Sequence, residues 1–346
     1  MVVADAVFTR DTIALSPLFA LSPLIACVVL PPLRTALFAV AAVLAAGISG
    51  FWHHDLDSAQ HLVRELDVFL VSSAAVMVSV TRIRQAQRLG RFVKLAEVAQ
   101  RAVLPVVPAH VRHTDIAVRY ESATEDTVIG GDLYDCYHSI SHTRFLIGDV
   151  RGKGIGAVEQ AGRVIRAFRQ AAAIHTDLDE VAEEMSAYLA PFFDEEEFVT
   201  AILLDTTVPS RPLLVNAGHP APLLVRLDGT YEFLETDADL PLGLGQDFSQ
   251  WEFDWKPGDR LLLFTDGVSE ARDADGEFLP LRDLVPVLRG QSVETTLDLV
   301  LARVRDHSVR GELGDDVAVM LLEHTTAIKE VRPRTREQDW LPLLPN

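Results

Sequence analysis

Hydrophobic positions in the first ninety residues form long uncharged stretches, unlike the pattern farther along the chain. Residues 13–30 hold no charged side chain and approach the roughly 20 apolar residues that cross a bilayer core. Residues 36–52 form a second such stretch, and residues 68–80 form a shorter third one. The pattern predicts an all-helical membrane segment over residues 1–83, with about three transmembrane helices.

Charged residues flank the third stretch unequally. The segment before it, residues 53–67, is mainly acidic, whereas the residues after it are basic (Arg82, Arg84, Arg88, Arg91 and Lys94). Because Lys and Arg are enriched in cytoplasmic loops, the chain after residue 81 is expected in the cytoplasm and the N-terminus outside. The predicted location is therefore the cell membrane, with several spans and with the chain that follows them in the cytoplasm.

The next segment, residues 84–110, has the pattern of a helical connector. Apolar residues recur at helical spacing over residues 84–104, and Pro105 and Pro108 then end the helix. Such a helix could transmit a signal, pair two chains into a homodimer, or pack as a simple linker. The spacing does not distinguish between these roles.

From residue 111 onward, short apolar runs alternate with Gly, Asp and Pro. The strand-like runs are residues 116–122, 144–150, 197–205, 212–218, 221–227, 259–267 and 316–323. Helical spacing is found over residues 155–174, 177–190, 281–289 and 293–307. Because strands come in consecutive runs, the pattern predicts an α+β fold with antiparallel sheets flanked by helices, over residues 111–324. A hairpin is expected around Gly218, and residues 325–346 are expected to form a flexible tail.

Charge separates the two parts of the chain. The first 94 residues carry eight Lys or Arg against six Asp or Glu, a net charge of +2, and the remainder carries 23 against 44, a net charge of −21. A surface this acidic repels nucleic acid and anionic lipid, so nucleic-acid binding is excluded as the expected function. Basic or metal-bearing partners are favoured.

Aspartates stand beside glycine at the ends of the apolar runs. Asp132 follows "GG", Asp149 and Asp266 close the runs "RFLIGD" and "RLLLFTD", and Asp315 with Asp316 opens the last run. Carboxylates gathered at one edge would repel one another, and a divalent cation would remove that repulsion. An all-oxygen ligand set favours Mg²⁺ or Mn²⁺, and two such ions can activate water for hydrolysis of a phosphate ester.

Five motifs occur in order: "GGDLYD", "GDVRGKG", "NAGHPAP", "FTDGVSEARD" and "GDDVAVM". Together they resemble the SpoIIE/RsbU-type branch of the metal-dependent serine/threonine protein phosphatases (PPM, type 2C-like). The resemblance implies an αββα sandwich of two antiparallel sheets between helices. It also implies a centre of two divalent cations, Mn²⁺ or Mg²⁺. Their ligands would be Asp132, Asp149, the carbonyl of Val150, Asp266 and Asp315, with Asp316 as the alternative to Asp315.

The resemblance further implies hydrolysis of phosphoserine or phosphothreonine in a cytoplasmic signalling protein, and for this branch an anti-anti-sigma factor. Lys153 and Arg151 are candidates to bind the substrate phosphate or are solvent-facing loop charges, and His219 is a candidate general acid or a turn residue. One alternative is an inactive PPM-like binding module. The other is a nucleotide-binding membrane ATPase, which the loop around Gly152 does not favour because its spacing differs from that of a Walker motif.

Overall fold

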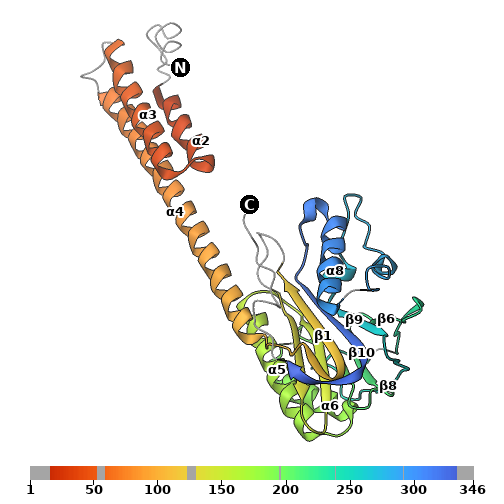
Figure 1. The fold of residues 1–346 in the computed structure, drawn as a ribbon. Helices are drawn as coiled ribbons and strands as arrows, with labels where there is room; N and C mark the ends of the chain where they lie inside the picture. Colours follow the sequence, from red (N-terminus) through yellow and green to blue (C-terminus); the bar gives the residue numbers. More distant parts are fainter. Residues whose placement is uncertain are drawn as a thin grey trace. The chain divides into compact units, whose positions relative to one another are not determined.

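The computed structural model describes residues 16–52, 59–122, 130–194, 196–237, 239–290 and 292–332. The chain divides into two compact units, Met1–Lys94 and Leu95–Asn346. Figure 1 shows the helices of the first unit and the sheets of the second. Each unit is described by itself.

The first unit is helical, as expected. A 3-10 turn, η1 (Ser16–Ala20), leads into α2 (Leu21–Val29), followed by α3 (Pro32–Trp52) and α4 (Ala59–Val103). Among the described residues, two stretches are long and apolar enough to cross a membrane, Pro32–Ser49 and His61–Arg91, of which 28% and 22% are buried. The first predicted span contributes only the shorter apolar helix Leu18–Val29.

Proline explains why that first helix is short. Leu30 is extended (φ −94°, ψ 155°), as expected for a residue that precedes proline, and α3 begins directly afterwards at Pro32. By contrast, the third predicted span and the connector form one continuous helix of 45 residues, because no proline interrupts the chain before Pro105. The turn between α2 and α3 contacts α4, since Ser79 and Arg82 both donate hydrogen bonds to the Leu30 carbonyl at 3.2 Å.

The second unit contains two five-stranded sheets in which every neighbouring pair is antiparallel. The first sheet has the order β1 (His110–Glu121), β10 (Val317–Arg332), β9 (Arg260–Phe264), β6 (Leu223–Val225) and β7 (Tyr231–Phe233). The second has the order β2 (Asp132–His138), β3 (Thr143–Val150), β4 (Val199–Asp205), β5 (Leu213–Ala217) and β8 (Trp251–Glu252).

Helices cover the outer faces of the sheets. The amphipathic helices α5 (Ile155–Ile174) and α6 (Leu178–Leu189) pack on the second sheet, while α7 (Asp266–Ser269) and α8 (Val293–His307) pack on the first (Figure 1). Short 3-10 turns complete the unit: η2 (Ala190–Phe192), η3 (Leu281–Leu284) and η4 (Val309–Gly311). The predicted αββα sandwich is therefore confirmed.

The alternation of side chains along β10 divides the core into two layers. Ala318, Met320 and Leu322 belong to the cluster that includes both sheets and the helices α5 and α6, while the intervening residues, Val319 and Leu321, belong to the cluster with α8. Successive residues of a strand point to opposite faces, so β10, an interior strand of the first sheet, supplies both layers.

Several elements differ from the sequence prediction. The predicted hairpin around Gly218 is wrong, because β5 and β6 belong to different sheets and residues 218–222 cross between them. Strand β2 was not expected, and the predicted helix 281–289 is only the turn η3. Strand β10 continues to Arg332, into the segment expected to be a tail.

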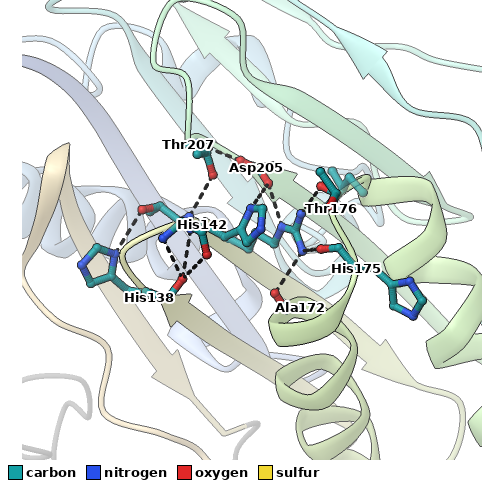
Figure 2. A network of polar contacts seen from close by, with 12 residues as sticks. His138, His142, Ala172, His175, Thr176, Asp205 and Thr207 are labelled. Carbon is teal, nitrogen blue, oxygen red and sulfur yellow. Dashed lines mark hydrogen bonds and ion pairs between the residues drawn. The ribbon is translucent and has the colours of Figure 1, made fainter.

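A buried arginine joins α5 to the second sheet (Figure 2). The side chain of Arg144 on β3 is fully buried, and its Nε donates to Asp205 Oδ2 on β4 at 2.7 Å. Its remaining nitrogens donate to the carbonyls of Ala172, His175 and Thr176, at 3.0, 2.7 and 2.5 Å. The guanidinium thus pairs with a buried carboxylate and satisfies carbonyl groups at the end of α5 that the helix itself leaves free.

We expect Arg144→Met to lower the free energy of unfolding by about 3–5 kcal/mol, because it removes the guanidinium that pairs with the buried carboxylate of Asp205. Chemical denaturation of the full chain in detergent measures the change. The matched control is Arg211→Met, whose guanidinium is 69% exposed and pairs with Glu252 at 2.5 Å. That pair should contribute less than about 1 kcal/mol. Equal losses in the two variants would contradict the role assigned to Arg144.

Candidate active site

Two of the predicted aspartates face each other across the second sheet. Asp132 begins β2 and Asp149 lies near the end of β3, and the strand register pairs these two residues directly. Directly opposed residues of an antiparallel pair project from the same face, with Cβ atoms about 5 Å apart. The motifs "GGD" and "IGD" are therefore adjacent in the fold although they are separate in the sequence.

The other two predicted aspartates come from the first sheet. Strand β9 ends at Phe264, so Asp266 begins α7 rather than closing the strand, and Asp315 lies just before β10. Hydrogen bonds join the two sheets here. Thr265 Oγ1 donates to Asp132 Oδ2 at 2.6 Å, and the Gly130 amide donates to Asp316 Oδ2 at 2.8 Å.

Glycine is required where the backbones meet. A Cβ atom on Gly131 would lie 2.2 Å from the Val150 carbonyl oxygen, and one on Gly267 would lie 2.0 Å from that of Asp316. No side chain fits at such distances, so the glycines beside Asp132 and Asp266 allow the strand ends to approach.

The four aspartates line one cavity of about 540 Å³. The lining residues are Gly130, Gly131, Asp132, Asp149, Arg151, Gly152, Lys153, Phe198, Thr200, Gly218, His219, Pro220, Asp266 and Asp315. Asp316 is not among them, because its buried carboxylate accepts hydrogen bonds from Tyr120 Oη and the Gly130 amide. Val150 is also not among them, so its carbonyl ligand role stays a prediction.

Three carboxyl groups at this cavity, those of Asp132, Asp149 and Asp266, have raised pKa values. Burial, followed by the charges of Asp266 and Asp315, raises the pKa of Asp149 to about 7. Burial and the charge of Asp149 raise the pKa of Asp132, and burial and the charge of Asp315 raise that of Asp266. The cavity therefore disfavours additional negative charge and favours a cation.

The donor set fits hard divalent cations. The carboxylates supply only oxygen, and the histidine at the cavity, His219, has both ring nitrogens engaged. Within the described part of the chain, no three His, Cys, Asp or Glu side chains already lie close enough together to hold an ion. Two ions would thus have to draw these carboxylates toward each other.

His219 is held in place by hydrogen bonds and cannot serve as the proposed general acid. Its Nδ1 lies 3.0 Å from Thr200 Oγ1, and its Nε2 lies 3.1 Å from the Phe264 carbonyl, to which it donates. Burial lowers the pKa of the ring to about 4, so the imidazole is neutral at pH 7. His219 instead connects β4, next to Asp149, with the end of β9.

The two predicted phosphate-binding residues both lie at the cavity. Lys153 Nζ is 3.0 and 3.1 Å from the two carboxylate oxygens of Asp315. Arg151 lies 3.7 Å from Glu196 and stacks over the ring of Phe198. Neither cation is buried, and both line the cavity.

Several supporting residues were not found from the sequence. Thr265 orients Asp132, Thr200 faces Asp149 across the sheet, and Tyr120 holds Asp316. Gln100, near the end of α4, donates to Tyr120 Oη at 2.5 Å and to the Gly130 carbonyl at 3.2 Å. Only Thr265 had a signal in the sequence, its position beside Asp266 in "FTDG".

We expect Asp149→Asn to stabilise the metal-free protein at pH 8. Because the pKa of Asp149 is raised in the folded protein, folding favours the uncharged carboxyl group. The wild type therefore loses stability as the pH rises through about 7. A neutral amide does not ionise, so the variant avoids this loss. The melting temperature in EDTA should rise, with each kcal/mol worth about 2–4 °C in a domain of this size. Added Mn²⁺ should stabilise the wild type more than the variant. A lower melting temperature for the variant in EDTA would contradict the repulsion between these carboxylates.

Comparison with known proteins agrees with this geometry. Residues 140–325, more than half of the chain, match the family Stage II sporulation protein E (SpoIIE). Phosphoserine phosphatase RsbU of Bacillus subtilis (strain 168) is 26% identical over 204 residues, which make up 56% of this chain and 59% of that protein. The match thus covers less than two thirds of RsbU.

Solved structures share the fold. The RsbU and RsbW domains of Rv1364c from Mycobacterium tuberculosis match with 25% identity and a TM-score of 0.55, over 67% of this chain and 65% of that one. The catalytic domain of serine/threonine phosphatase PstP, solved with two manganese ions, matches with 17% identity and a TM-score of 0.50, over 61% and 98%. The chain therefore belongs to the SpoIIE family, within the PPM (type 2C-like) serine/threonine protein phosphatases.

Proposed function

We propose that this chain is a membrane-anchored, metal-dependent phosphatase that hydrolyses phosphoserine or phosphothreonine on a cytoplasmic signalling protein. The observation that carries the proposal is the convergence of four aspartates, two from each sheet, on one cavity that also holds Lys153 and Arg151. Anionic groups for metal and cationic groups for phosphate thus meet at one place.

The residues have distinct tasks in this proposal. Asp132, Asp149, Asp266 and Asp315, with the Val150 carbonyl, would hold two Mn²⁺ or Mg²⁺ ions, which when bound lower the pKa of water and neutralise phosphoryl oxygens. Lys153 and Arg151 would bind the phosphoryl oxygens. In hydrolysis a water oxygen forms a bond to phosphorus and gives up a proton, while the bond between phosphorus and the serine or threonine oxygen breaks and that oxygen takes up a proton. Because both ring nitrogens of the neutral His219 are already hydrogen-bonded, we assign the second proton to water rather than to His219.

The substrate we propose is a phosphorylated anti-anti-sigma factor. Support comes from the resemblance to the SpoIIE/RsbU-type branch and from the similarity to RsbU, itself a phosphoserine phosphatase. The acidic catalytic part, with its net charge of −21 from residue 95 onward, favours a substrate surface that carries basic residues. Pairing of two chains through residues 84–104 stays a prediction.

The membrane anchor is supported by α3 and α4. Both contain apolar stretches of sufficient length of which only 28% and 22% are buried, whereas the core helix of a soluble protein is mostly buried. The basic end of the apolar stretch in α4 predicts a cytoplasmic catalytic unit. A reporter that is active only in the cytoplasm, fused after Lys94, should be active, and the same reporter placed in residues 53–58 should not. The reverse pattern would contradict the orientation.

The decisive experiment is a phosphatase assay of the full chain in detergent. We expect Mn²⁺-dependent release of phosphate from a phosphoserine peptide, loss of release in EDTA, and no comparable hydrolysis of ATP. Binding of the phosphopeptide without hydrolysis would favour the alternative of an inactive binding module. Hydrolysis of ATP alone would favour the alternative of a membrane ATPase. Hydrolysis that persists in EDTA would overturn the metal-dependent mechanism.

A further inference from the structure

The loop between β3 and α5 carries Lys153 between two glycines with left-handed backbone conformations. Gly152 has φ 120° and Gly154 has φ 94°. A Cβ atom on Gly152 would have no neighbour within 4 Å, so the backbone conformation, rather than lack of space, requires glycine there. Lys153 thus extends from a turn that has room around it, at the mouth of the cavity.

Lys153 forms the one ion pair between a basic side chain and any of the four predicted ligands, within the described parts of the chain. Its ammonium group contacts both oxygens of Asp315, and both side chains are 44% exposed. The pair also joins the two sheets, since Lys153 follows β3 and Asp315 precedes β10. Arg151, two residues away in the same loop, contacts Glu196 instead, at 3.7 Å.

Lys153 and a divalent cation would compete for the carboxylate of Asp315. A divalent cation at Asp315 would lie within a few ångströms of an ammonium group that already contacts both carboxylate oxygens, and like charges at that distance repel each other. A divalent cation that binds Asp315 would therefore weaken the contact of Lys153 with the two carboxylate oxygens. A lysine released from Asp315 remains beside the cavity, where it can bind an anionic group.

We propose that Lys153 is an exchange residue, which neutralises Asp315 in the metal-free protein and binds the substrate phosphoryl group once Asp315 has taken a divalent cation. The proposal rests on the proposed function and adds an order of binding, with metal before phosphoprotein. Lys153 thus has two successive partners, first the carboxylate of Asp315 and then a phosphoryl oxygen of the substrate.

The exchange role predicts that Lys153→Ala changes the affinities for Mn²⁺ and for phosphate in opposite directions. Loss of the competitor should tighten Mn²⁺ binding about two- to fivefold, as expected for an exposed ion pair. Loss of the cation should weaken binding of inorganic phosphate to the Mn²⁺-loaded protein by about tenfold or more. If Lys153 had only a structural role, its loss would weaken the binding of both Mn²⁺ and phosphate.

The test is isothermal titration calorimetry on the full chain in detergent, first with Mn²⁺ alone and then with inorganic phosphate. Arg151→Ala is the matched control, because it removes the same charge from the same loop and cavity without a contact to Asp315. Lys256→Ala removes a similar exposed pair, 2.9 Å from Asp254, and should change neither affinity. In an Asp315→Asn background, Lys153→Ala should no longer tighten Mn²⁺ binding.

The outcomes separate this proposal from the proposed function. If Arg151→Ala tightens Mn²⁺ binding as much as Lys153→Ala does, the effect is general electrostatics and the exchange role is overturned. If the wild type binds Mn²⁺ and hydrolyses phosphoserine but Lys153→Ala leaves the Mn²⁺ affinity unchanged, the exchange role alone is overturned. A wild type that binds no Mn²⁺ overturns both.

Discussion

Asp266→Asn is expected to lower the rate of phosphoserine hydrolysis by at least about 100-fold while the protein remains folded. Substitution of a residue that only holds a metal ligand in place lowers metal affinity or activity by about 10–100-fold. Loss of a ligand carboxylate itself should lower the activity more. The side chain lines the cavity and is partly exposed, and removal of its charge relieves repulsion from Asp315, so the fold should not suffer. Steady-state kinetics with a phosphoserine peptide, together with a melting curve, measure both effects.

Glu270→Gln provides the control for Asp266→Asn. Glu270 lies four residues farther along, raises the pKa of Asp266 through its charge, and lines a neighbouring cavity rather than the proposed site. Its replacement removes the same charge and should change the rate by less than about fivefold, as for other partly solvated charges. If both variants lose activity equally, the carboxylate of Asp266 has no special role.

Gly131→Ala should be highly damaging although it adds only a single methyl group. The new Cβ would lie 2.2 Å from the Val150 carbonyl oxygen and 2.7 Å from the Val150 Cβ, so the ends of β2 and β3 must separate. Overpacking costs about 1–3 kcal/mol, and a displacement of about 1 Å at a reacting centre costs about 100-fold in rate. Both the melting temperature and the rate should fall.

Gly156→Ala is the matched control for Gly131→Ala. Gly156 lies in the first turn of α5, and a Cβ there would meet nothing within 4 Å. The variant should be neutral or more stable by about 0.5–1 kcal/mol, because alanine favours the helix. A harmless Gly131→Ala would show that β2 and β3 are not packed as closely as the distances indicate.

Sequence periodicity predicted the helices well where one face is buried. The bounds expected for residues 155–174 and 293–307 are those of α5 and α8, because each carries a clear apolar stripe. Strand β2 gave no such signal. Its buried positions include Asp132 and Asp135, and Asp135 is satisfied by Arg169 on α5 at 2.7 Å, a contact that no local pattern reveals.

The four aspartates could be predicted because each stands beside glycine at the end of an apolar run. What could not be predicted is how they meet. The expected hairpin around Gly218 would have kept β5 and β6 in one sheet, whereas the chain crosses between sheets there, and His219 bridges them. The contact of Lys153 with Asp315 spans 162 residues, so it follows only from the packing of one sheet on the other.

The strand order β1-β10-β9 has a consequence for synthesis of the chain. Strand β1 is the first strand to leave the ribosome, yet its one partner in the sheet is β10, the last described strand. Asp315 also arrives only with β10. A nascent chain can complete the second sheet, which ends with β8, before the first sheet can close with β10, and pairing across such a sequence distance is slow. Asp315 therefore joins the cavity only after the other residues that line it have been synthesised.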